Sequence, residues 1–482
     1  MALNSLTFIG FFALVFALYW LLQHNARWQN ALLLVASYVF YALCDWRMLP
    51  VPMVMTTAFW FLGKKIGALK TAGADHQAAQ LTTMTVVVGL LPLLYFKYFG
   101  FFAQSITSLL VAAGLHCSSS MLGIMLPVGI SFFTFRLLSY AIELNRGTIT
   151  PERDIVAFGT YVAFFPVLMA GPIDRPQTFL PQLQTCRTPN YDTLVDGLKR
   201  FIWGCFLKVC VADQLAVFVD EILGNYASHN ALTILPATLL YPMQLYADFA
   251  GYSHMAIGVS AMLGLKVAEN FRRPFFAQNV AEYWRRWHMS LTSWLTDYVF
   301  IPLNVRWRDG RKWGIIAACT VNMLLVGFWH GANWTFGFFG LYHALLFIPL
   351  ILRGTMNKRR KIEWKHGVLA LSTLLRITGT YLLVAMGMLI FRSASIGDAF
   401  ATMAQVLTIG PLPSFEGKMA LIAGSICMLV MWINDWLEER NNGCGLLRSK
   451  RPLTIVLSLA ALVFVVLLLH SSATEVFIYQ KF

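Results

Sequence analysis

The sequence predicts an all-α, polytopic membrane protein. Of its 482 residues, 58% are hydrophobic and only 12% are charged. Soluble domains contain about 45–50% apolar and about 25% charged residues, so this chain cannot cover a water-facing surface, and a soluble globular enzyme is excluded. Aromatic residues make up 14% of the chain, and this content excludes a disordered protein.

Apolar stretches follow one another along the whole chain, which is the third observation behind the predicted fold. A bilayer core of about 30 Å requires roughly 20 apolar residues per helical span. We therefore expect about 11–13 transmembrane or re-entrant helices in one membrane-embedded domain, residues 1–482. The stretches lie near 5–23, 29–46, 50–63, 82–103, 121–144, 155–171, 199–224, 232–264, 314–330, 334–352, 367–391, 417–436 and 453–470.

Two of these stretches contain proline and glycine in their interior, at Leu126–Gly129 and at Pro166–Pro172. A broken helix is tolerated at membrane depth only where protein or a water-filled cavity binds the freed backbone groups. The breaks therefore predict a central cavity in the protein body.

The chain has a formal charge of +14, and its basic residues concentrate in a few loops. We attribute this charge to cytoplasmic loops and anionic lipid rather than to nucleic acid. Two apolar segments separate the two late clusters, so both clusters lie on one side, which the positive-inside rule makes the cytoplasm. The clusters consist of Lys358, Arg359, Arg360, Lys361 and Lys365, and of Arg440, Arg448, Lys450 and Arg451.

The eight cysteines form no CxxC pair, and several of them lie inside apolar runs. They are expected to be small core residues rather than disulfide or metal sites. The first apolar run lacks a basic flank and a small-residue cleavage site, so it is expected to be a membrane helix.

Residues 266–312 differ from the rest of the chain because arginines and tryptophans alternate there. Such a segment cannot be a simple span. It is either an interfacial helix with aromatic anchors or a polar lining folded into the protein, and the two interpretations are compatible.

His330 stands at the end of a long apolar run and is followed by Gly331, Ala332 and Asn333. Imidazole is the side chain whose unperturbed pKa suits proton transfer near neutral pH. The glycine allows a substrate or another backbone to approach closely. The alternative is a hydrogen-bonded core histidine without a catalytic role.

His288 is the second candidate, because it follows Trp284, Arg285 and Arg286 in one motif. On a continuous helix, Trp284 and Arg285 would share a face with His288; a snorkelling interfacial segment is the alternative. Asp248, inside an apolar run, requires a cation, and the arginine cluster that follows could supply it.

Other chemistry finds no support in the sequence. The histidines lack metal-ligand spacing and have no cysteine pair nearby, so no metal site is expected. P-loop, dinucleotide-binding and serine-hydrolase motifs are absent.

Several sequence segments, taken in their order along the chain, resemble the membrane-bound O-acyltransferase (MBOAT) family. The resemblance is to its bacterial branch that contains the membrane subunit of alginate O-acetylation. The matches run nearly from end to end. They are Ala36–Ala42, Tyr95–Phe99, Leu126–Phe135, Ala170–Ile173, Glu269–Phe271 with Arg273-Pro274, Trp284–Ser290 and Gly327–Gly331.

The resemblance implies a ring of helices around a thin core and the transfer of an acyl group from a thioester to a hydroxyl. It implies that His330 is the catalytic histidine and that His288 supports it. Trp329 and Asn333 are then expected to place the donor or to bind the oxyanion. Arg285, Arg286 and Asp297 are expected to contact substrate. Thr296 and Asn304-Val305 depart from the family pattern, so substrate details near them do not transfer.

We therefore expect a multi-pass enzyme of the bacterial inner membrane that moves an acetyl group toward an exported cell-surface polysaccharide or a periplasmic acetyltransferase. The donor is expected to be acetyl-CoA or an acyl-phosphopantetheine carrier, with no permanently bound cofactor. Three alternatives stay open at this point. They are D-alanyl or other acyl transfer from a carrier protein, a non-enzymatic transporter of a lipid-linked sugar, and a scaffold for a secreted acetyltransferase.

Overall fold

The computed structural model describes residues 1–114, 125–358, 360–365, 368–411, 413–441, 443–448 and 452–469. The chain divides into two compact units, which are described separately. Unit 1 consists of Met1–Phe201 and Met255–Ala268, and unit 2 of Ile202–His254 and Glu269–Phe482. Helices α10 and α12 each contribute residues to both units. The single domain expected from the sequence stays a prediction.

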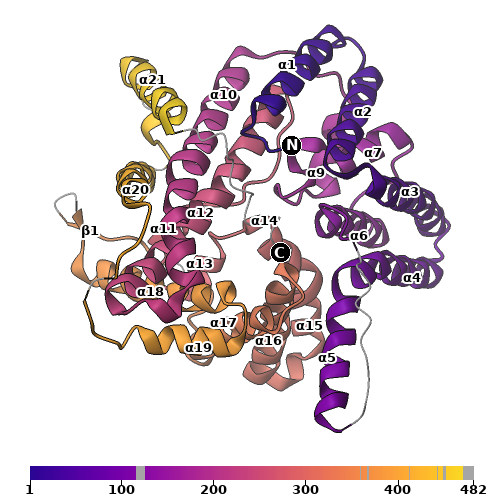
Figure 1. Ribbon diagram of the computed structural model, residues 1–482. Coiled ribbons are helices and arrows are strands. Elements are labelled where there is room, and N and C mark those ends of the chain that lie inside the picture. Colours follow the sequence, from indigo (N-terminus) through magenta and orange to yellow (C-terminus); the bar gives the residue numbers. More distant parts are fainter. Residues whose placement is uncertain are drawn as a thin grey trace. The chain divides into compact units, whose positions relative to one another are not determined.

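The regular structure described in unit 1 is helical (Figure 1). Its elements are α1 (Leu6–Leu21), α2 (Ala26–Asp45), η1 (Trp46–Met48), α3 (Pro50–Thr71), α4 (Asp75–Leu93), η2 (Leu94–Tyr98), α5 (Phe99–Ala112), α6 (Ile130–Arg146), α7 (Ile155–Ala163), α8 (Phe165–Leu168), α9 (Pro176–Leu183) and most of α10 (Tyr191–Phe206).

The two predicted helix breaks lie against each other in unit 1. Gly129, with φ +70°, precedes α6, and a Cβ added there would lie 2.5 Å from the carbonyl oxygen of Leu168. Buried Arg136 donates hydrogen bonds to the carbonyls of Tyr161, Val162 and Pro172. A protein side chain therefore binds the backbone groups that the break frees, as helix breaks at membrane depth require.

In its described residues, unit 2 contains the remaining helices and two short paired strands. Its elements are η3 (Leu207–Ala212), α11 (Asp213–Gly224), η4 (Tyr226–Ser228), most of α12 (Ala231–Met262), η5 (Pro274–Phe276), α13 (Val280–Trp284), α14 (Met289–Leu295), η6 (Thr296–Phe300), α15 (Ile301–Arg306), η7 (Arg308–Gly310), α16 (Arg311–His330), α17 (Trp334–Leu352), β1 (Trp364–Lys365), β2 (Val368–Leu369), α18 (Leu371–Arg392), α19 (Ile396–Gln405), α20 (Lys418–Arg440), η8 (Leu446–Arg448) and α21 (Pro452–Leu469).

Strands β1 and β2 pair antiparallel, with Trp364 opposite Leu369. The rest of the regular structure in the described residues is helical, which confirms the predicted all-α class.

Among the described residues, seven helical runs are long and apolar enough to cross a membrane. Of the other apolar stretches, some form shorter or broken helices, such as α1 and α8, and two form the long helices α3 and α12. Together they confirm a multi-pass membrane protein. The seven runs are Ala26–Met48, Asp75–Ala112, Tyr191–Gly224, Arg308–His330, Trp334–Leu352, Leu371–Arg392 and Lys418–Arg440.

Helices α16 and α17 form an antiparallel hairpin whose two backbones approach closely (Figure 1). A Cβ added at Gly327 would lie 3.0 Å from the carbonyl carbon of Phe336 and 3.2 Å from the amide nitrogen of Gly340. Small residues allow this approach between helices in a membrane. The hairpin fixes the position of His330, the last residue of α16 before the short turn.

The open end of this hairpin carries basic residues. The Lys312 ammonium donates to the carbonyl of Leu352 at 2.8 Å, so the start of α16 lies beside the end of α17. The rings of Trp364 and Trp436, which adjoin the two predicted basic clusters, lie 6.0 Å apart. The described parts of the two clusters therefore lie close together, and the side of the membrane on which they lie stays a prediction. Arg359, Lys450 and Arg451 lie outside the described residues, and the Arg448 side chain is not described.

The arginine- and tryptophan-rich segment 266–312 divides into two parts. Trp284, Trp287 and His288 are buried, so the first part lines the protein interior. Arg306, Arg308, Arg311 and Lys312 are exposed in the second part. The interpretation as a lining folded into the protein therefore applies to the first part, and an interfacial position of the second part stays a prediction.

The prediction that the cysteines are core residues holds for Cys210, Cys319 and Cys427, which are buried. It is wrong for Cys186 and Cys444, which are exposed in connections between helices. Cys117 lies outside the described residues.

Candidate active site

His330 is the last residue of α16 and is 5% exposed. Its ring lies among three phenylalanine rings, with centroid distances of 4.9 Å to Phe391, 6.4 Å to Phe336 and 6.4 Å to Phe339. These rings come from α17 and α18, so two helices enclose the imidazole that α16 presents. A polar ring in such a setting is shielded from bulk water, and this strengthens any charge interaction that it makes.

Asn333 fixes the turn that follows His330. Its side-chain oxygen accepts a hydrogen bond from the amide of Thr335 at 3.1 Å and so caps α17. Its side-chain nitrogen donates to the carbonyl of Ala394 at 3.1 Å. The amide that was predicted to bind substrate therefore joins the His330 turn to the end of α18. Trp329, also predicted to bind substrate, is buried next to His330 in the chain.

The motif around His288 is not one helix. Helix α13 ends at Trp284, α14 begins at Met289, and His288 itself has φ +43°, the left-handed conformation. The prediction that Trp284 and Arg285 share a helical face with His288 is therefore wrong. Long-range backbone bonds hold this break, because the amide of Arg272 donates to Arg286 and the amide of Met289 donates to Asn270.

His288 is completely buried, and its hydrogen bonding defines one tautomer. Its Nδ1 lies 3.0 Å from the side-chain oxygen of Asn270, which also accepts from the Ser290 hydroxyl at 2.8 Å. Since that oxygen accepts, Nδ1 carries the proton and Nε2 is the acceptor. Burial lowers the pKa of His288 from 6.5 to about 3, so the imidazole is neutral at physiological pH.

Trp284 and Phe339 connect the motif to His330. The Trp284 ring lies 6.2 Å from Phe339, whose ring also contacts His330. The Trp284 indole donates to Nδ1 of His343 at 3.3 Å. His343 is fully buried on α17, and the sequence reasoning missed it. His343 could have been found in the sequence, because a polar residue within an apolar span is a functional candidate by default.

Two of the three charged residues that were predicted to contact substrate lie near the basic loop of unit 2. Arg286 is paired with Glu282 at 2.7 Å and with Glu439 at 3.0 Å, and Arg285 donates to the carbonyl of Met356. Both arginines therefore lie near the basic loop, at the end of the hairpin opposite His330. Asp297 lies in η6 and is partly exposed. Their roles toward substrate stay predictions.

The cation beside Asp248 is Lys208, not the arginine cluster that was expected. The Lys208 ammonium lies 2.8 Å from Asp248 and 2.7 Å from Asp213. Lys208 lies in the π-helical turn η3, and a Cβ added at Gly251 of α12 would lie only 3.0 Å from its backbone nitrogen. This close helix packing brings the lysine to Asp248, and spacing along the chain could not reveal it.

Comparison with known proteins agrees with this architecture. The family model described as MBOAT, membrane-bound O-acyltransferase family, matches residues 151–391. This range contains His288, His330 and His343.

Three relatives illustrate the range of named activities. The chain is 38% identical to a probable alginate O-acetylase of Azotobacter vinelandii, over 85% of this chain and 79% of the relative. It is 27% identical to a peptidoglycan O-acetyltransferase of Helicobacter pylori, over 91% of this chain and 84% of the relative. It is 32% identical to a teichoic acid D-alanyltransferase of Bacillus subtilis, over 55% of this chain and 68% of the relative.

Proposed function

Because the chain belongs to the membrane-bound O-acyltransferase family, we propose that it transfers an acetyl group from a thioester donor to a hydroxyl of an exported cell-surface polysaccharide or of a periplasmic partner. Membership of the family makes it an O-acyltransferase, and its long apolar helices make it a multi-pass protein of the inner membrane. The acetyl group, the acceptor and the residue roles below are the proposal.

The choice of acetyl transfer rests on the relatives. The relatives named for O-acetylation match 85% and 91% of this chain, whereas the D-alanyltransferase matches 55%. Transfer of D-alanine from a carrier protein is the second candidate because that relative is still 32% identical.

The observation that carries the mechanism is the position of His330. In the proposed reaction, the acceptor hydroxyl attacks the thioester carbonyl while His330 takes the hydroxyl proton. The tetrahedral intermediate then expels the thiolate, which receives that proton, and the products are an acetyl ester and a free thiol. General-base assistance of this kind is typically worth 10²–10⁴-fold.

Neutral His288 supports the reaction in this proposal without carrying charge itself. Its Nε2 is an acceptor nitrogen in a fully buried ring, which suits it to position a donor group rather than to exchange a proton. The buried Trp329 indole is a candidate hydrogen-bond donor to the oxyanion. Asn333 contributes indirectly, since its side chain holds the turn that carries His330.

The donor is proposed to approach from the basic end of the hairpin. Arg285 and the exposed Arg306, Arg308 and Lys312 lie toward this end, and guanidinium and ammonium groups bind phosphates well. Acetyl-CoA or an acyl-phosphopantetheine carrier supplies such phosphates. Helix α16 has 20 residues, which span about 30 Å at about 1.5 Å per residue. The thioester must therefore reach His330 through the depth of the protein.

The test uses the full chain in proteoliposomes with labelled acetyl-CoA and a mixture of bacterial polysaccharide fragments. We expect label in the fragments as a base-labile ester, and we expect His330→Ala to remove it. A parallel reaction offers a D-alanyl carrier protein, which would be the better donor if the second candidate were correct.

Two results would contradict the proposal. One is an unchanged rate of ester formation in folded His330→Ala protein. The other is movement of a lipid-linked sugar across the membrane without any acyl transfer, which is the behaviour of a transporter. Tyr342→Phe, which removes a hydroxyl from α17 on a residue without a proposed role, serves as the control.

A further inference from the structure

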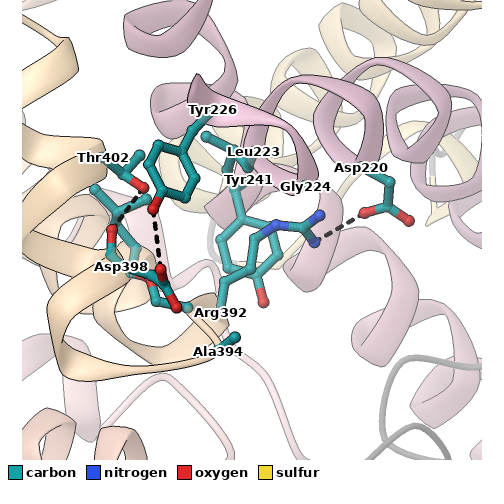
Figure 2. Close-up of a pocket in the computed structure, with 11 residues that line it drawn as sticks. Asp220, Leu223, Gly224, Tyr226, Tyr241, Arg392, Ala394, Asp398 and Thr402 are labelled. Atoms are coloured by element: carbon teal, nitrogen blue, oxygen red, sulfur yellow. Dashed lines mark hydrogen bonds and ion pairs between the residues drawn. The ribbon is translucent and has the colours of Figure 1, made fainter. Parts of the chain in front are cut away.

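A cavity of about 560 Å³ lies in unit 2 where helices α11, α12, α18 and α19 end or begin (Figure 2). Pockets of about 300–1,000 Å³ are typical of small-molecule sites. None of the sequence motifs indicated this cavity, because its walls come from segments far apart in the chain. The chemistry of its lining residues restricts which ligands fit it.

Two polar pairs form the walls. The Tyr226 hydroxyl donates to the Asp398 carboxylate at 2.9 Å, and Arg392 is paired with Asp220 at 2.8 Å. The Arg392 guanidinium also lies over the ring of Tyr241, 5.2 Å from its centroid. Figure 2 shows both pairs facing the same space, with Thr402 beside Asp398. Carboxylates, a hydroxyl and aromatic rings thus line one cavity.

The charge of these walls restricts the occupant. Two carboxylates and one guanidinium leave one negative charge, and Arg392 is already paired with Asp220. Hydrogen bonds from Ser395 and then from Tyr226 lower the pKa of Asp398, so this carboxylate is ionised at neutral pH. A second anion, such as a phosphate or a uronate, would be repelled. Cations and uncharged groups remain, and of these we take an uncharged ligand, because its hydroxyls can donate to the carboxylates while its apolar face contacts an aromatic ring.

The cavity shares a wall with the candidate active site. Phe391, whose ring lies 4.9 Å from that of His330, immediately precedes Arg392 in the chain. The carbonyl of Ala394, a lining residue, accepts from Asn333 in the His330 turn. A ligand in this cavity is therefore held next to the segment that encloses the proposed base.

The cavity also lies at the end of the helices opposite the basic loop. Helix α18 begins at Leu371, directly after that loop, and ends at Arg392 in the cavity wall. If the basic loop is cytoplasmic, as the positive-inside rule predicts, the cavity opens toward the outer side. This is the side on which an exported saccharide would be met.

We propose that this cavity binds an uncharged sugar ring of the acceptor, with Asp398, Tyr226 and the Arg392–Asp220 pair as its hydrogen-bonding groups. This inference rests on the proposed function in one respect only, namely that the bound sugar is the acceptor. It adds the class of sugar: a neutral hexose unit rather than a uronate.

Binding is tested first without any donor, so that the result does not depend on acetyl transfer. Calorimetric titration of the full chain in nanodiscs uses cellohexaose as the neutral probe and a hexauronate as the anionic one. We expect saturable binding of cellohexaose to the wild type and to His330→Ala, and at least tenfold weaker binding of the hexauronate. Asp398→Asn and Tyr226→Phe are expected to weaken cellohexaose binding about tenfold, because each removes or weakens a charge-assisted hydrogen bond.

Asp309→Asn is the matched control, since this carboxylate is almost fully exposed on η7 and does not line the cavity. It is expected to leave both affinities unchanged. Equal binding of both probes would overturn the proposal, as would no binding of cellohexaose or affinities within twofold of wild type in both cavity variants. Binding of alaninamide in place of cellohexaose would overturn it too, because it would identify an ammonium site.

A steady-state measurement then links the cavity to catalysis. With acetyl-CoA and cellohexaose, Asp398→Asn is expected to raise the acceptor KM about tenfold and to leave kcat within twofold. A fall in kcat at constant KM would contradict a binding role. If cellohexaose binds but is never acetylated, the proposed function fails while the cavity assignment stands.

Discussion

Replacing Gly327 with alanine places a methyl group between the two helices that carry the candidate active site. The new Cβ would lie 3.0 Å from the carbonyl carbon of Phe336 and 3.2 Å from the amide nitrogen of Gly340, and the Phe336 oxygen would be closer still. Ordinary contact begins at 3.4 Å. These are backbone atoms, which cannot rotate away, so α16 and α17 must separate by on the order of 1 Å.

That separation acts directly on His330, which lies three residues further along α16 against Phe336 and Phe339 of α17. A displacement of about 1 Å can reduce catalysis about 10²-fold. Overpacking of this kind also costs about 1–3 kcal/mol of the free energy of unfolding. We therefore expect Gly327→Ala to lower kcat/KM for acetyl transfer by about 10²-fold while the protein still inserts.

Gly379→Ala is the matched control, because it lies on α18 with no atom within 4 Å of the added Cβ. Alanine is the better helix former by about 1 kcal/mol, so this variant should be fully active and slightly more stable. Acetyl transfer and thermal unfolding are measured on both purified variants. Activity of Gly327→Ala within twofold of Gly379→Ala would refute the link between hairpin packing and the His330 position.

Three further predictions concern the stability of unit 2, each measured by thermal unfolding in detergent. Lys208→Met leaves Asp213 and Asp248 without their buried cation, so it is expected to lower the free energy of unfolding by about 3–5 kcal/mol. The control Lys199→Met, from a more exposed pair, should cost less than about 1 kcal/mol. Equal losses in the two variants would contradict this prediction. Because burial lowers the pKa of His288 from 6.5 to about 3, the unfolded state binds the extra proton between these values. The free energy of unfolding is therefore unaffected by this proton above pH 6.5 and declines by about 1.4 kcal/mol per pH unit below it. The variant His288→Gln should flatten that slope. Asn333→Ala removes the cap of α17 and should cost about 1 kcal/mol, whereas no loss would mean that the cap is not formed.

The helical class, the membrane location and the His330 turn could be predicted from the sequence because local patterns determine them. Apolar runs of span length and a glycine next to His330 are visible without a fold. The ion pair of Arg286 with Glu282, four residues earlier, could also be predicted from helical spacing. Glu439, the second partner of Arg286, was not, since it lies 153 residues away in the chain.

Long-range pairs account for what the sequence could not reveal. Tyr226 and Asp398 form a hydrogen bond although they are 172 residues apart in the chain, and Trp284 and His343 do so although they are 59 residues apart. The break at His288 was missed for the same reason, because the backbone of Asn270 stabilises it from outside the motif. Helix periodicity favoured one continuous helix, and tertiary hydrogen bonds decided otherwise.

Chemical rescue of His330→Ala tests whether this imidazole takes the proton of the acceptor hydroxyl. The variant is assayed for acetyl transfer with and without added imidazole, and its unfolding temperature is compared with that of wild type. We expect a rate about 10²–10⁴-fold below wild type, partial recovery with imidazole, and no recovery with imidazole in Gly327→Ala. A folded His330→Ala protein that transfers acetyl groups at the wild-type rate would contradict it.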